Sequence, residues 1–255
     1  MDMKKAFIMM VFSAMLSGLA FVSCGKDDSA TNNNDGTEQP TPQPTPNPGQ
    51  DTTQPHPTVA WVDMGLPSGL LWAECNLGAH APEEYGDYYA WGEISPKEVY
   101  NWSTYRYCSV DGEGNLQTLT KYNTSSAYGS IDNLTTLEAM DDAATAALGS
   151  GAHIPTADEW RELIDNTTEE WTTMNGVNGR KFIATNGNIL FLPAAGRRGS
   201  AGLEYAGEHG FYWSSTLNTD DPRYARRFLF NADSTSLRTY CRRFNGPAVR
   251  AVRHN

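Results

Sequence analysis

The chain has 255 residues, of which 39% are hydrophobic, so it has enough apolar side chains for one or two folded domains. Its net charge is −11, which argues against nucleic acid as a partner. Residues 196–255 are an exception, because they carry ten Arg, no Lys and only five acidic residues. This basic segment is interpreted either as a recognition face for anionic or planar groups, or as solvent-facing strand positions.

The first residues have the pattern of a targeting segment. Lys4 and Lys5 precede an uncharged apolar run, Ala6–Val22, which is rather short for a membrane-spanning helix. The run leads into Phe21-Val22-Ser23-Cys24, which resembles a bacterial lipobox. We therefore expect residues 1–23 to be a lipoprotein signal peptide and Cys24 to carry the lipid that anchors the chain in the membrane. The alternative is an ordinary signal peptide followed by an incidental cysteine.

The segment after Cys24 predicts an exposed location and a spacer. Gly25-Lys26-Asp27-Asp28 resembles the acidic export tag of Bacteroidetes surface lipoproteins, which implies an outer-membrane protein that faces outward at the cell surface. Residues 24–57 have few apolar side chains and include alternating prolines from Pro40 to Pro48, so we expect a disordered, semi-rigid stalk. At roughly 3.1 Å per residue, such a stalk spans on the order of 100 Å. The globular domain is predicted at residues 58–255.

The domain is predicted to begin with strands and loops and to continue into a helix. Two short strands are expected within residues 61–72, on either side of a Gly/Pro turn, and residues 75–130 are expected to form long loops with many aromatic side chains. Thr135 and Glu138 have the spacing of a capping box, which predicts a helix start. Gly149 predicts the end of this helix after an alanine-rich run.

A second helix and several hairpins follow. Thr156 and Glu159 form another capping box, and Trp160, Leu163 and Ile164 recur at helical spacing as one buried stripe. Strands are predicted at 182–185 and 188–192 around an Asn-Gly turn, at 211–215, at 224–231 and 237–241, and at 248–252. Two helices combined with antiparallel hairpins and long loops define an α+β domain.

Several sequence strings occur in the order and spacing of a known family. They are Val62–Ala73, Tyr85–Glu93, Asp141–Ala144, His153–Trp160, Phe191–Gly196, Tyr212–Ser215 and Val249–Val252. Across residues 60–252 the chain resembles the Fibrobacter succinogenes major paralogous domain family, which is common in Bacteroidetes lipoproteins. That family is grouped with C-type-lectin-like folds, alongside the formylglycine-generating enzymes. The resemblance implies a C-type-lectin-like domain with a ligand face on its C-terminal half.

The C-terminal segment between two of these strings supplies the candidate ligand-binding residues. They are Arg223, Tyr224, Arg226, Arg227, Arg238, Tyr240, Arg242 and Arg243. Tyr and Arg give large contact area and directional hydrogen bonds, so we expect an extracellular glycan or protein ligand at this face. The mixture also resembles segments that diversity-generating retroelements rewrite in some lectin-fold proteins, and ordinary surface variation on a hairpin is the alternative.

One metal site is considered. Glu138, Asp141 and Asp142 have the spacing i, i+3, i+4 on the predicted first helix, where their carboxylates could bind Ca²⁺. The alternative is that acidic residues are favoured in the first turns of a capped helix by its dipole. The calcium signatures of sugar-binding C-type lectins, Glu-Pro-Asn and Trp-Asn-Asp, are absent, so we expect no calcium-dependent sugar binding and no cofactor.

No catalytic constellation is recognised, so we do not expect an enzyme. The five histidines are scattered, and Cys75, Cys108 and Cys241 do not match the cysteine pair of the formylglycine-generating enzymes. These three thiols allow at most one disulfide, whose pairing stays open. Two alternatives remain: a hydrolase or oxidase on the formylglycine-generating scaffold, and a structural component of a surface or fimbrial assembly.

Overall fold

The strands of the protein pair into five small antiparallel sheets in a computed structural model that describes residues 59–255. The predicted signal peptide, Cys24 and the stalk lie outside the described residues. The strands are β1 (Trp61–Asp63), β2 (Leu71–Ala73), β3 (Cys108–Val110), β4 (Leu116–Leu119), β5 (Ala152–His153), β6 (Thr167–Met174), β7 (Val177–Ala184), β8 (Ile189–Pro193), β9 (Arg197–Gly199), β10 (Gly202–Glu204), β11 (Gly210–Leu217), β12 (Tyr224–Phe230), β13 (Thr235–Arg242), β14 (Gly246–Pro247) and β15 (Val252–Arg253). The helices are α1 (Ala143–Leu148) and α2 (Ala157–Asp165), with 3-10 turns η1 (Trp102–Thr104), η2 (Ser126–Tyr128) and η3 (Ala139–Asp141).

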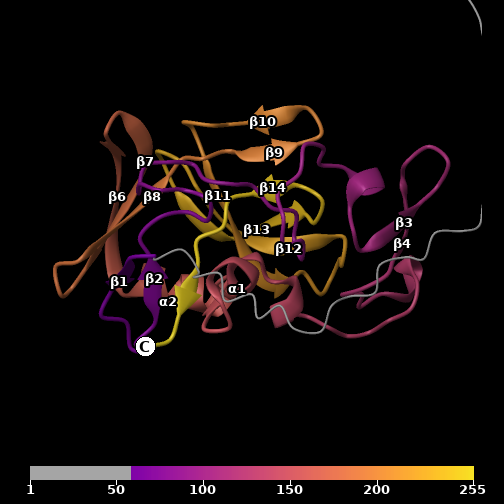
Figure 1. Ribbon diagram of the computed structural model, residues 1–255, viewed down its shortest axis with the longest axis horizontal. Coiled ribbons are helices and arrows are strands. Elements are labelled where there is room, and N and C mark those ends of the chain that lie inside the picture. Colours follow the sequence, from indigo (N-terminus) through magenta and orange to yellow (C-terminus); the bar gives the residue numbers. More distant parts are fainter. Residues whose placement is uncertain (1–58) are drawn as a thin grey trace, which may run out of the picture. The chain divides into compact units, whose positions relative to one another are not determined.

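The sheets surround a central one, β11–β12–β13 (Figure 1). In this view α1 and α2 lie below the central sheet, and β9 and β10 lie above it. The sheet β6–β7–β8 stands at the left end and the hairpin β3–β4 at the right end. The predicted α+β composition, with two helices and antiparallel hairpins, is therefore confirmed. Among the described residues, no helix has both the length and the apolar character needed to cross a membrane.

Strand β11 holds the two halves of the core together. The register between β11 and β12 shifts between Trp213 and Leu217, so this part of β11 lacks regular ladder partners. Indole N–H groups replace some of them: Trp160 donates to the carbonyl of Trp213 and Trp91 to that of Ser214, at 3.1 and 2.9 Å. The strings that contain Trp91 and Trp160 thus meet at β11, where their indoles satisfy carbonyls that the irregular register leaves without ladder partners.

Two hydrophobic clusters lie on either side of β11. Tyr212 belongs to the cluster that contains Trp160, Phe228 and other side chains from β7 and β8, whereas the next residue, Trp213, belongs to the other cluster. Successive strand residues point to opposite faces, so one strand can supply both clusters. Trp160 is fully buried and stacks on Phe228 with ring centroids 5.0 Å apart. The buried stripe predicted for this helix is confirmed at Trp160 and Leu163, while Ile164 is half-buried.

Tyrosines fix the long loops between β2 and α1. The hydroxyl of Tyr88 donates to the carbonyl of Ala195 at 2.6 Å, and that of Tyr100 donates to the carbonyl of Tyr88 at 2.6 Å. Tyr105 donates in the same way to Trp91 at 2.8 Å. Each ring is buried and its polar end is satisfied by backbone, so these loops are held in place without regular secondary structure.

The first helix differs from its prediction. It begins after Asp142 and not after Thr135, because the Asp142 carboxylate accepts hydrogen bonds from the N–H groups of Ala144 and Thr145. Glu138 has no side-chain cap bond and precedes η3. The capping-box prediction for Thr135 and Glu138 is therefore wrong. The buried Asp142 is a stronger cap, since it also accepts from the Ile154 N–H at 2.8 Å and ties the helix to β5.

The second helix and the hairpins follow the predictions closely. Thr156 and Glu159 form the reciprocal capping box of α2. The predicted hairpins are β7–β8 and β12–β13, and the predicted strand 211–215 lies within β11. Strand β6, with the sequence TTEEWTTM, was not predicted because its polar side chains conceal its alternation.

The final predicted strand, 248–252, is only partly a strand. Its backbone bonds go to separate elements, since the carbonyl of Ala248 accepts from Trp213, that of Val249 from Leu77 and that of Ala251 from Ala73. Only β15 then pairs regularly, with β2 and β5. The segment joins distant parts of the chain and does not extend one sheet.

Candidate functional site

Four of the predicted ligand-binding side chains form a ladder on the hairpin β12–β13. In the antiparallel register Tyr224 lies opposite Arg242, and Arg226 lies opposite Tyr240. Residues two apart on a strand share a face, so these four side chains lie on the same face of the hairpin. The Arg226 guanidinium lies 5.8 Å from the centre of the Tyr240 ring. We call these four residues the Arg/Tyr ladder.

Arg238 extends the ladder along β13. Arg238, Tyr240 and Arg242 are all exposed, with Tyr240 at 38%, while Cys241 between them is buried. Within the described residues, no carboxylate lies within 4.0 Å of Arg226, Arg238 or Arg242. Their guanidinium groups therefore keep N–H donors that a ligand can use.

Two hollows are lined in part by ladder residues. One, of about 300 Å³, is lined by Tyr224, Tyr240 and Arg242 from the ladder and by the β9–β10 hairpin, where Arg197 and Glu204 form an ion pair of 3.0 Å. The other, of about 210 Å³, is also lined by Tyr224 and Arg242. Its further walls are Trp102, Asn115, Leu116, Tyr128 and Arg223. Two ladder residues, Tyr224 and Arg242, thus line both hollows.

Arg223 and Arg227 stand next to the ladder but have structural partners. Arg223 forms a 2.7 Å ion pair with Asp221, whose pKa it lowers by hydrogen bonding, and it lies over the Tyr128 ring at 4.9 Å. Arg227 points to the opposite face of β12 and packs on Phe211 at 4.6 Å. Burial lowers the pKa of Arg227. Arg223 therefore lines the second hollow with its guanidinium already paired to Asp221, and Arg227 lies on the other face of β12.

Arg243 is a correction to the predicted site. It is fully buried and donates to the carbonyls of Lys121, Tyr122 and Pro222, at 2.9, 3.1 and 3.1 Å, and to the hydroxyl of Tyr105. Its guanidinium therefore fastens the long loops to the β13 end of the central sheet and is unavailable to an external ligand. The sequence did not distinguish Arg243 from Arg242, because the two arginines are adjacent.

Arg250 has a similar structural role that its sequence pattern concealed. The alternation of residues 248–252 predicts a solvent-facing position, but Arg250 is 0% exposed. It donates to the carbonyls of Ala73, Glu74 and Phe191 and to the side-chain oxygen of Asn76. Burial lowers its pKa. Part of the Arg excess in the C-terminal segment thus stabilises the scaffold.

The predicted calcium ligands do not converge. Glu138 and Asp141 both pair with Lys121, and Asp141 also accepts hydrogen bonds from the hydroxyls of Tyr107 and Tyr122. Burial opposes the Asp141 charge, but these hydrogen bonds hold its pKa below the ordinary value. Asp142 belongs to the helix cap. The three residues do not share a helix face, and no group of three or more metal-ligating side chains occurs in residues 59–255.

The three cysteines of the described domain are free, so none of the possible disulfides forms among them. Burial raises the pKa of the Cys75 and Cys108 thiols, which disfavours their thiolate forms. Cys241 is buried, and its sulfur accepts hydrogen bonds from Arg197 and Asn245.

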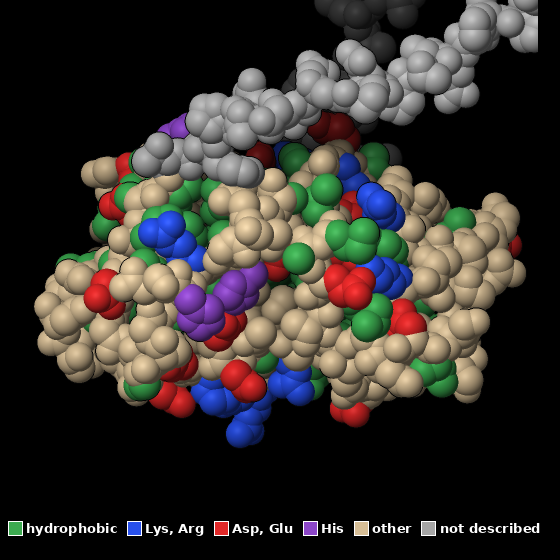
Figure 2. Space-filling model, turned by 60° about the horizontal axis from the view of Figure 1, so that its bottom comes forward, with side chains coloured by type: hydrophobic (Ala, Val, Ile, Leu, Met, Phe, Trp, Pro, Cys, Tyr) green, Lys and Arg blue, Asp and Glu red, His purple; other side chains and the backbone are tan. Residues whose placement is uncertain are grey.

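One histidine forms a charged pair on the surface. His153 bonds Glu159 at 3.0 Å, and its ring lies 6.2 Å from that of His254. Figure 2 shows histidine side chains side by side on one face, next to acidic ones. Burial opposes the charge of His153, but Glu159 raises its pKa above the ordinary value. Because Glu159 also caps α2, this pair is explained by helix stability.

Sequence reasoning missed Trp102 and Tyr128 beside the ladder. Both come from the long loops and are far from residue 224 in the chain, so only their aromatic character signalled a role.

Comparison of the chain with protein-family models, curated proteins and solved structures found no match in any of the three.

Proposed function

We propose that this chain is a lipid-anchored protein of the outer cell surface that binds an extracellular glycan or protein ligand. Its folded part is proposed to be a C-type-lectin-like domain of the major paralogous type, as the resemblance of residues 60–252 implies. The Arg/Tyr ladder and Arg238 are proposed to contact the ligand. Cys24 is proposed to carry the anchor, and residues 24–57 to hold the domain away from the membrane.

The binding proposal rests on a difference between the arginines in their ion-pair partners and their burial. Arg180, Arg197 and Arg223 have carboxylate partners, and Arg243 and Arg250 are fully buried. Arg226, Arg238 and Arg242 have neither a carboxylate partner nor a buried position. Other arginines, such as Arg161 and Arg198, share this property, but these three lie together on one hairpin with Tyr224 and Tyr240. An unpaired guanidinium next to a phenol ring contributes little to folding, whereas Arg and Tyr together are frequent at the centres of binding surfaces.

The charge of the ladder favours an anionic ligand. Guanidinium groups bind carboxylates and sulfates through paired N–H donors, and the neighbouring rings can stack on a sugar or an apolar side chain. The two hollows that ladder residues line add concave surface for larger groups. An acidic glycan or an acidic protein loop fits this combination.

The test is capture on glycan and protein arrays by the purified protein. The variant R226A/R242A should lose capture by about tenfold or more, since each truncation removes hydrogen bonds to a charged group. A matched control is R106A/K181A, which changes the net charge equally at exposed or half-buried positions outside the ladder. Equal capture by both variants would refute the role of the ladder.

The anchor is tested separately. Radiolabelled fatty acid should be incorporated into the wild-type chain and not into C24A. Protease added to intact cells should degrade the wild-type domain if it faces outward. A labelled C24A chain, or a domain protected until the cells are broken, would contradict this part of the proposal.

A further inference from the structure

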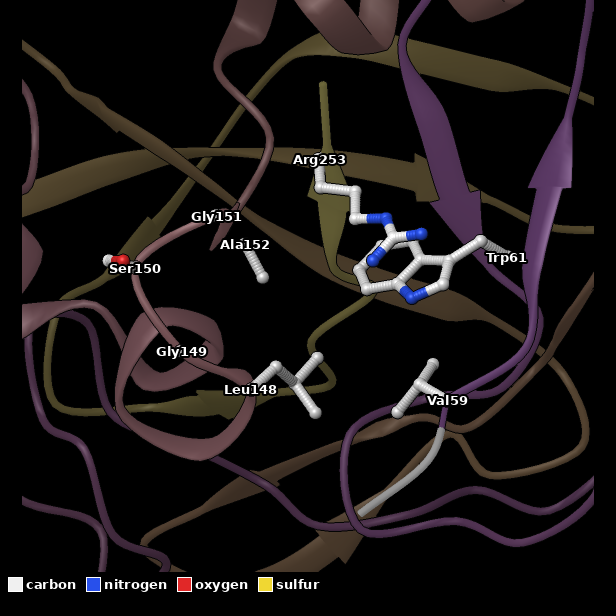
Figure 3. Close-up of a pocket in the computed structure, with 8 residues that line it drawn as sticks. All are labelled: Val59, Trp61, Leu148, Gly149, Ser150, Gly151, Ala152 and Arg253. Carbon is white, nitrogen blue, oxygen red and sulfur yellow. The ribbon is translucent and has the colours of Figure 1, made fainter. Parts of the chain in front are cut away.

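A further cavity lies between the sheet β1–β2–β15–β5 and the end of α1 (Figure 3). Its volume is about 490 Å³, within the range of small-molecule sites. The lining residues are Val59, Trp61, Leu148, Gly149, Ser150, Gly151, Ala152 and Arg253. None of them belongs to the ladder or its hollows.

The walls of this cavity are apolar. Val59 and Leu148 face its open space in Figure 3, while the Ser150 side chain points away from it. The Trp61 indole forms another wall, and Trp61 is only partly buried. A ligand body that is apolar or aromatic would bury the surfaces of these side chains, which is the main source of affinity in such sites.

Among residues 59–255, Arg253 is the only charged residue that lines the cavity. Its guanidinium lies over the Trp61 ring, 4.6 Å from the ring centre. Within residues 59–255, no carboxylate lies within 4.0 Å of it, and its buried Nε has no hydrogen-bond partner. Stacking uses the face of the guanidinium, whereas its N–H donors lie in its plane. The stack therefore orients Arg253 and leaves its donors free.

We propose that this cavity binds a small carboxylate with an apolar or aromatic body. The planar carboxylate matches the two parallel N–H donors of one guanidinium. The body lies against Trp61, Val59 and Leu148. A site with one guanidinium among apolar walls suits a ligand with a single negative charge. It suits phosphate less well, because phosphate is usually held by several donors. This site does not depend on the binding function proposed for the ladder.

The test uses phenylacetate and its neutral counterpart, phenylacetamide, with the purified protein and ligand-observed NMR. Phenylacetate has about ten non-hydrogen atoms and should bind with a Kd on the order of 1 mM or tighter. The amide should bind at least about tenfold more weakly, and R253Q should weaken phenylacetate by a similar factor. R106A, at an exposed position outside both the ladder and this cavity, should bind phenylacetate like the wild type.

A second variant tests the cavity even if R253Q fails to fold. Gly151 lines the cavity, and a Cβ added there meets no atom within 4 Å, so G151L is expected to fold, to occupy part of the cavity and to weaken binding. G112L is the matched control, because Gly112 is equally unobstructed but lies between β3 and β4. Equal affinity for acid and amide, undiminished binding by G151L, or binding of inorganic phosphate without phenylacetate would each overturn the proposal.

Discussion

Replacing Arg243 by alanine should strongly destabilise the fold, although the residue lies in the segment predicted to bind ligand. The buried guanidinium makes four hydrogen bonds, three of them to backbone carbonyls. Each is worth about 1.5–3 kcal/mol, but the buried charge itself costs several kcal/mol in lost hydration. R243A would leave three carbonyls and the Tyr105 hydroxyl without this donor and would open a cavity, for a total loss of about 3–5 kcal/mol.

This loss should be visible in thermal unfolding. For a domain of this size, about 1 kcal/mol corresponds to roughly 2–4 °C, so R243A should lower Tm by roughly 6–20 °C. R243K should recover part of the loss, because an ammonium group keeps the charge but cannot reach four acceptors in a planar arrangement. R226A should change stability by less than about 0.5 kcal/mol, as expected at a partly exposed position without a carboxylate partner. An R243A protein that melts within the error of R226A would refute this reasoning.

Three further predictions follow from the scaffold. W160F should lower the free energy of unfolding, measured in urea, by about 1–3 kcal/mol, because the Trp213 carbonyl loses its indole donor. W171F should lower it less, because Trp171 is only half-buried. G210A should destabilise the domain by about 1–3 kcal/mol, because a Cβ at this position would lie 2.1 Å from the Phe230 ring. G151A should be neutral, because a Cβ there meets no atom within 4 Å. Equal melting temperatures of the two variants would contradict this packing. The raised pKa of His153 means that its pairing with Glu159 stabilises the fold fully below about pH 6.5, its ordinary value, and that this contribution disappears as pH rises through the raised value. The difference in Tm between wild type and H153Q should therefore shrink from pH 6 to pH 9, and a constant difference would contradict the assignment.

Local signals in the sequence predicted the elements that are stabilised locally. The capping box of Thr156 and Glu159, and the Asn-Gly turn at residue 186, depend on neighbours within a few residues, and both are present in the structure. The start of α1 depends instead on Asp142, whose carboxylate also binds the distant Ile154 N–H. A capping motif read from neighbouring residues alone could not reveal that contact.

The candidate site shows the same limit. Arginine content marked the C-terminal segment correctly as unusual, but it did not separate exposed from buried side chains. Arg242 and Arg243 are adjacent, and alternation along β13 leaves the first exposed, while the second turns into the core at the strand end. The acceptors of Arg243 come from residues 105–122 and 222, so only the folded chain shows them.

The most direct measurement of the central claim is a map of the bound ligand by backbone-amide chemical shifts. A ligand captured on the arrays would be titrated into isotope-labelled protein. The account predicts the largest shifts at residues 224–226 and 238–242, with smaller ones in the loops that carry Trp102 and Tyr128. Shifts concentrated elsewhere, with the hairpin β12–β13 unchanged, would contradict it.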